Sequence, residues 1–126
     1  MESKRGDRPV RPDMCTLLRF AELSVQRQLL VRLCQTTNYG YIQGLEVKDS
    51  EPILNPSPRV WVEIKLDKDE TTRREIDLAD FALPDEICRL MARLDQFQNG
   101  PIERIEVRAG IPCRLVFERR LEESRR

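Results

Sequence analysis

The sequence predicts a single α+β domain in which two helices pack on one face of an antiparallel sheet. Two segments carry apolar residues at helical spacing, one at residues 24–37 and one from Pro84 onward. Each is followed by short segments with an apolar residue at every second position, as in half-buried strands. The order helix, strand, strand, twice over, is that of a ferredoxin-like sandwich whose first strand has been moved to the end.

The first predicted helix covers residues 24–37. Ser24 is suited to cap its N-terminus, because its hydroxyl can accept a hydrogen bond from a free backbone N–H. The apolar stripe that follows is formed by Leu30, Val31 and Cys34. Asn38-Tyr39-Gly40 then supplies a stop, because Asn and Gly tolerate the left-handed backbone conformation that ends many helices. The alternating residues 43–48 then predict a strand.

Prolines separate this strand from the next one. They lack the N–H that a strand ladder needs, so residues 49–58 are expected to form a stiff loop. In residues 60–66 aliphatic side chains then alternate with Trp61, Glu63 and Lys65, which is the strongest strand signal in the chain. Residues 68–72 predict a turn, and residues 74–78 predict a short strand that pairs back.

The second half follows the same order. Pro84 suits the start of a helix, and the acidic Asp85 and Glu86 favour its N-terminal turn. Asn99-Gly100 ends this helix, and an alternating strand with Ile105 and Val107 follows. The inner face of the final strand is expected to carry Cys113, Leu115 and Phe117.

A shift of 60 residues aligns the two halves with each other. It sets Gly40 on Gly100, Glu46 on Glu106 and Leu30 on Leu90, among other matches. A helix with one hairpin cannot bury its apolar face alone, so two such units are expected to close a shared core. We therefore predict a pseudo-twofold αββ repeat, with copies at about residues 23–66 and 83–119. Chance similarity between short strands is the alternative.

Length and composition indicate one folded unit. The chain has 126 residues, 40% of them apolar and 35% charged, which suits one core with a charged surface. Residues 14–119 are expected to fold, and the charged segments 1–13 and 120–126 to form flexible tails. No segment approaches the roughly 18 apolar residues that a membrane span needs. We expect a cytoplasmic protein without membrane contact.

The residues available for chemistry are few. The chain has no histidine, which removes the Ser-His-Asp and Cys-His designs, and no glycine-rich phosphate loop occurs. A zinc site is not expected from the widely spaced cysteines, which predict buried thiols: Cys15, Cys34, Cys88 and Cys113. The segment 67–70, Asp-Lys-Asp-Glu, lacks the glycine and the distal Glu of a calcium loop and favours a solvated turn. We expect no metal, no cofactor and no enzymatic activity.

The predicted sheet face away from the helices carries one tryptophan and interleaved charges. Its expected members are Gly44, Glu46, Lys48, Trp61, Glu63, Lys65, Arg104, Glu106, Arg108, Arg114, Val116 and Glu118. A lattice of solvated ion pairs is one interpretation. The functional interpretation is a docking face for a protein, since Trp and Arg dominate interface energetics. Its predicted contact residues are Trp61, Arg104, Arg108, Arg114, Tyr39 and Tyr41.

These observations predict a small binding module that acts as an adaptor, regulator or self-associating subunit, with the proline loop at residues 52–58 as a further contact. Because Lys plus Arg equals Asp plus Glu at 22 each, no net charge attracts it to nucleic acid. A nucleic-acid module is the alternative, and it would use Arg104, Arg108, Arg114, Arg119, Arg120 and the basic N-terminal tail. An enzyme without histidine would be favoured if a deep pocket enclosed Asp77, Asp80 and Asp85.

Overall fold

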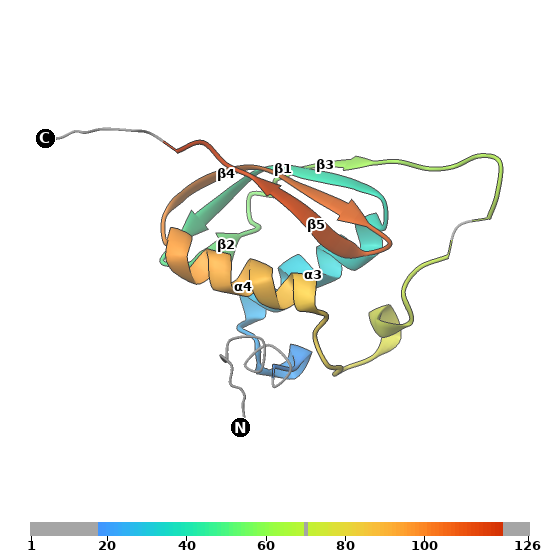
Figure 1. Ribbon diagram of the computed structural model, residues 1–126, viewed down its shortest axis with the longest axis horizontal. Helices are drawn as coiled ribbons and strands as arrows, with labels where there is room; N and C mark the ends of the chain where they lie inside the picture. Colours follow the sequence, from blue (N-terminus) through green and yellow to red (C-terminus); the bar gives the residue numbers. More distant parts are fainter. Residues whose placement is uncertain (1–17, 70, 120–126) are drawn as a thin grey trace, which may run out of the picture.

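The computed structural model describes residues 18–69 and 71–119. Both predicted tails, Cys15, Glu70 and Arg120 lie outside the described residues. In the described part an antiparallel sheet has both α-helices on the same side, which confirms the α+β class (Figure 1). In chain order the elements are η1 (Phe20–Glu22), α3 (Val25–Thr37), β1 (Gly40–Lys48), β2 (Glu51–Ile53), β3 (Arg59–Val62), η2 (Arg74–Asp77), α4 (Asp85–Phe97), β4 (Gly100–Arg108) and β5 (Ile111–Val116).

The two hairpins meet through their first strands. The sheet order is β2-β1-β4-β5, and β3 pairs with the same edge of β1 as β2. In a ferredoxin-like sheet with its first strand moved to the end, the second strand of each hairpin would be central. The observed order therefore differs from the predicted permuted arrangement. The reason is that β1 and β4 each bury three side chains whereas β2 and β5 each bury one, and burial is greatest at the centre of a sheet.

Both predicted helices are confirmed. The Ser24 hydroxyl accepts a hydrogen bond from the Arg27 backbone N–H at 3.2 Å, and Pro84 precedes α4. The helices end on residues with positive φ, Asn38 at 65° and Gln98 at 66°. The predicted apolar stripes are buried: Leu30, Val31 and Cys34 in α3, and Ile87, Leu90, Met91 and Leu94 in α4.

The core lies between the helices and the two central strands. Each strand contributes three side chains that are at most 2% exposed: Ile42, Leu45 and Val47 from β1, and Ile102, Ile105 and Val107 from β4. Burying one such side chain stabilises a fold by about 1.5–3 kcal/mol. The core therefore holds the two hairpins together across the β1–β4 pairing.

The strand predicted at residues 60–66 ends early. Only Arg59–Val62 pairs with β1, because Gly40, the partner of Val62, is the first residue of β1. Beyond it the Glu63 N–H donates to the Tyr39 carbonyl oxygen at 2.7 Å. Residues 63–69 then leave the sheet (Figure 1).

Two further local predictions were wrong. Residues 74–77 form the 3-10 helix η2 rather than a strand, because the carbonyl oxygens of Glu75, Ile76 and Leu78 accept hydrogen bonds from the Arg32 guanidinium instead of from a neighbouring strand. The predicted loop at residues 49–58 contains β2, in which Pro52 is buried opposite Val47. An edge strand tolerates a proline whose missing N–H faces away from the ladder.

The inner face of β5 also differs from the prediction. A register shift lies between Glu106, which pairs with Arg114, and Val107, which pairs with Pro112. Cys113 is therefore an extra residue, and a bulge of this kind turns side chains to the other face. Pro112 is buried and Cys113 is exposed, so Cys113 does not lie on the inner face. Leu115 packs against the core and Phe117 meets Phe97 of α4 at 5.2 Å, so both lie on the inner face as predicted.

The cysteines only partly match the expectation of buried thiols. Cys34 and Cys88 are buried, and Cys113 is exposed because of the bulge. Cys34 and Cys113 are free thiols. None of the helices in the described residues combines the length and apolar character needed to cross a membrane.

Candidate functional site

The sheet face opposite the helices, which we call the outer face, presents rows of side chains across the strands. In β1 the outward-facing Tyr41 precedes the fully buried Ile42. The register then places Trp61 of β3 beside Tyr41, Tyr41 beside Glu106 of β4, and Glu106 beside Arg114 of β5. A second row places Arg59, Gln43 and Arg104 side by side.

Five of these residues form an aromatic–arginine cluster: Tyr41, Gln43, Arg59, Trp61 and Arg104. The rings of Tyr41 and Trp61 are stacked, with centroids 6.0 Å apart. The guanidinium carbon of Arg59 lies 5.3 Å from the Trp61 ring centroid, and that of Arg104 lies 5.3 Å from the Tyr41 centroid. The Trp61 indole N–H donates to Gln43 Oε1 at 2.9 Å. The cluster is therefore held in place by contacts between its own members.

The two arginines of the cluster carry charge without a local counter-ion. In the described part of the chain neither Arg59 nor Arg104 forms an ion pair, whereas the nearby Glu106 lies 3.8 Å from Arg114. The Nε–H of Arg104 is shielded from solvent and has no hydrogen-bond partner there. A shielded charged donor without an acceptor is costly.

The predicted contact residues fall into three groups. Trp61, Tyr41 and Arg104 come together in the cluster, as their strands are adjacent. Arg114 is a neighbour, but its ion pair with Glu106 already occupies it. Arg108 and Tyr39 do not belong to the cluster. Arg108 is exposed at the end of β4, and Lys65 Nζ lies 5.7 Å from the centroid of the Tyr39 ring.

Two members of the cluster were missing from the sequence-based prediction. Arg59 lies two residues before Trp61, and Gln43 lies two residues after Tyr41. The period of a strand puts each pair on one face, so alternation alone could have identified them. The predicted proline-loop contact does not join the cluster through Pro52, which is buried in β2.

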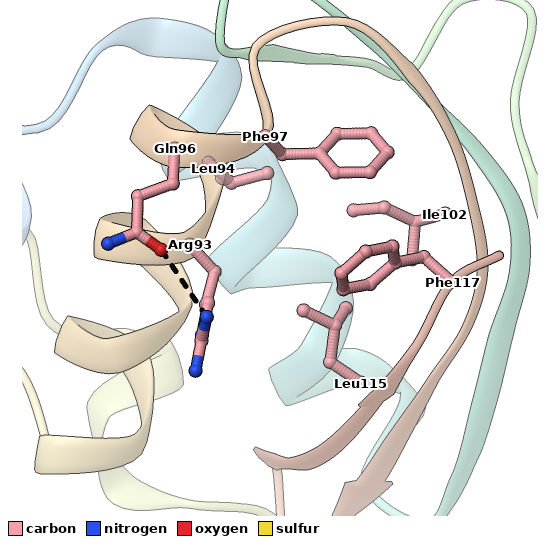
Figure 2. Close-up of a pocket in the computed structure, with 7 residues that line it drawn as sticks. All are labelled: Arg93, Leu94, Gln96, Phe97, Ile102, Leu115 and Phe117. Carbon is pink, nitrogen blue, oxygen red and sulfur yellow. Dashed lines mark hydrogen bonds between the residues drawn. The ribbon is translucent and has the colours of Figure 1, made fainter. Parts of the chain in front are cut away.

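A groove lies on the other side of the molecule, between the end of α4 and β5. It contains a cavity of about 220 Å³, whose lining side chains are drawn in Figure 2. They are Arg93, Leu94, Gln96, Phe97, Ile102, Leu115 and Phe117. Phe97 and Phe117 meet edge to face at 5.2 Å, and Arg93 donates to Gln96 at 3.3 Å. The volume is below the roughly 300–1,000 Å³ of typical ligand pockets, and the lining holds neither a carboxylate nor a thiol.

The acidic residues of the enzyme hypothesis lie elsewhere. Asp80 accepts hydrogen bonds from Arg19 Nε and the Ala21 N–H, both at 2.8 Å. The hydrogen bond from Arg19, followed by the one from Ala21, holds the pKa of Asp80 below its ordinary value. Asp77 belongs to η2 and Asp85 begins α4, and both are exposed. The three carboxylates therefore do not surround the groove.

A metal site is also not evident in the described residues. There, no three His, Cys, Asp or Glu side chains are arranged to hold a metal ion. Asp67 and Asp69, from the predicted acidic turn, are both exposed.

Comparisons of the chain with protein-family models, with curated protein sequences and with solved structures found no match.

Proposed function

We propose that this chain is a small non-catalytic binding module that recognises an acidic segment of another protein through its outer face. The observation that supports this most is the pair of arginines around the stacked Tyr41 and Trp61, with no carboxylate of the described chain bound to either. Trp, Tyr and Arg are the residues that contribute most to protein interfaces. A module that binds another protein in this way would act as an adaptor or regulator.

The chemistry of the arginines suggests the type of partner. A guanidinium binds a carboxylate through two parallel hydrogen bonds, and that of Arg104 forms no ion pair within the described residues. The stacking of Arg104 on Tyr41 limits its rotation, so less side-chain freedom is lost on binding. An Asp or Glu side chain docked on Arg104 would neutralise its charge.

We also propose that the two αββ halves are related by duplication and pseudo-twofold symmetry. In support, α3 and α4 each have 13 residues and start 60 positions apart, as do the nine-residue strands β1 and β4. The Ser50 N–H donates to the Gln98 carbonyl oxygen, and the Gly110 N–H donates to that of Asn38. A twofold axis between β1 and β4 would relate these two hydrogen bonds.

The proposed location is the cytoplasm. Cys34 and Cys113 are free thiols, and free thiols are usual in a reducing compartment. Cys113 is also exposed, and an exposed thiol is prone to oxidation outside such a compartment.

Nucleic acid is the second candidate partner, favoured by one observation. Tyr41 joins Trp61 on the outer face, so the sheet presents two aromatic side chains rather than one. Bases bind such sheets by stacking on aromatic rings. Against it, the chain carries 22 basic and 22 acidic residues, so no net charge attracts it to nucleic acid. Protein therefore ranks first.

Affinity purification of the tagged chain from its own cells tests the proposal, with nuclease treatment of half the sample. Partners should survive nuclease, and Trp61→Ala or Arg104→Ala should reduce their recovery about tenfold. Arg89→Ala is the matched control, because Arg89 is exposed on α4, away from the outer face. Equal recovery with all three variants would reject the outer face. Loss with nuclease would favour the nucleic-acid candidate.

A further inference from the structure

The segment with the strongest strand pattern in the chain, residues 60–66, is unpaired over much of its length in the described residues. Aliphatic side chains occupy every second position from 60 to 66, yet pairing with β1 ends at Val62. Three apolar side chains at alternate positions of this segment are exposed: Val62 by 54%, Ile64 by 61% and Leu66 by 95%. Figure 1 shows the chain running on beyond the sheet after β3. We call residues 62–66 the projecting segment.

The backbone of this segment is also available. In the described residues β3 is paired along one edge only, with β1. After Val62 the backbone makes one cross-strand hydrogen bond, from the Glu63 N–H to the Tyr39 carbonyl oxygen. Open edges of this kind are templates for pairing with another chain. The segment therefore offers unused backbone donors and acceptors next to unburied apolar side chains.

We propose that the projecting segment pairs with the same segment of a second copy, antiparallel and centred on Ile64. In this register Glu63 of each copy lies opposite Lys65 of the other, so the dimer gains two oppositely charged cross-strand pairs. Val62 lies opposite Leu66, and the two Ile64 side chains are neighbours. Charged residues share one face and apolar residues the other, which is the self-complementarity that a twofold interface requires.

The charges select this register over its neighbours. A pairing centred on Glu63 would place Glu63 opposite itself, and a pairing centred on Lys65 would place Lys65 opposite itself and Glu63 opposite Asp67. Like charges directly opposite each other destabilise a sheet. Only the Ile64-centred register pairs Glu63 with Lys65. The occupant that complements the segment best is therefore its own copy.

The mass of the chain in solution, measured by sedimentation across a range of concentrations, tests this proposal. The wild-type chain should shift from monomer to dimer as concentration rises. Glu63→Lys and Lys65→Glu should each weaken the dimer about tenfold or more, because both cross-strand pairs become repulsive. An equimolar mixture of the two variants should restore the dimer, since position 63 of one variant and position 65 of the other then carry opposite charges.

The control is Glu103→Lys, an exposed charge change on β4 that should leave the dimer unchanged. A wild-type chain that stays monomeric at every concentration overturns the proposal, as does a mixture that binds no better than either variant. Such a result would leave the outer-face proposal standing, because partner capture through Trp61 and Arg104 is a separate measurement.

Cross-linking tests the register itself. In a chain with Cys15 and Cys113 replaced by serine, Ile64→Cys should form a disulfide between copies, because residue 64 lies opposite itself. Val62→Cys is the matched control, since residue 62 lies opposite residue 66 and should cross-link at least several-fold more slowly. Faster cross-linking of Val62→Cys would overturn the Ile64-centred register.

Discussion

The two hairpins of this protein have equivalent central strands, β1 and β4, and differ in their edge strands. From the pair Glu46–Ile53 to the pair Gln43–Arg59, β1 moves back three residues while its partner chain advances six, so three residues are extra. In the second hairpin a single extra residue, Cys113, interrupts the pairing of β5 with β4. One edge is therefore split into two short strands, and the other remains one strand with a bulge.

The difference shows which part of a hairpin is free to vary. A residue added to a central strand would move its apolar side chains out of the core, since a one-residue slip reverses every side chain. At an edge, the extra residues face solvent, and their cost is smaller. The consequence is nevertheless large: the first edge ends in the projecting segment, and the second turns Cys113 outward.

The largest expected effect concerns the bulge at Cys113. Burial raises the pKa of the Cys34 thiol to about 12, so at pH 8 it is almost entirely protonated and shielded, whereas Cys113 is exposed. Under native conditions iodoacetamide should modify Cys113 at least about a thousandfold faster than Cys34, because the thiolate is the reactive form. Peptide mass mapping of the labelled sites measures both rates. Comparable rates would place Cys113 on the inner face and remove the bulge.

A second experiment compares equivalent glycines at the starts of β1 and β4. Gly40 and Gly100 both have positive φ, 147° and 129°, but an added Cβ at Gly40 would collide with the Trp61 carbonyl oxygen. At Gly100 the nearest contact would be the Phe97 ring at 3.4 Å. Gly100→Ala should cost about 1–3 kcal/mol. Gly40→Ala should cost at least about 1 kcal/mol more.

Urea unfolding of both variants gives the comparison between the glycines. Similar losses of unfolding free energy would mean that β3 does not lie over Gly40, and the two edges would then resemble each other more than the structure indicates.

The smallest effect is expected where the segments before the two helices meet. Hydrogen bonds from Arg19 and then Ala21 lower the pKa of Asp80, so its stabilising effect is present above the ordinary Asp pKa of about 3.9 and is lost as pH falls through the lower folded value. Asp80→Asn should lower the unfolding temperature slightly at pH 7. The difference from wild type should vanish in stronger acid. A constant difference from pH 7 to pH 2 would contradict this linkage.

Much of the fold could be predicted because its signals are local. Ser24 and Pro84 mark helix starts, and the spacing of Leu30 and Leu90 marks their buried faces. Part of the candidate site was also within reach, since Trp61 and Arg104 lie on strands whose alternation puts them outward. The stacking of Tyr41 on Trp61 was not, because it depends on which strands are neighbours.

The sequence by itself therefore determined the helices, the central strands and the apolar residues that form the core, because each of these depends on the spacing of residues along one segment. Only the tertiary structure decided the order of the strands, the early end of β3 at Val62, the outward turn of Cys113 and the pairing of Arg19 with Asp80. Each of these depends on a partner far away in the sequence, and local periodicity carries no information about where a strand's partner begins or ends.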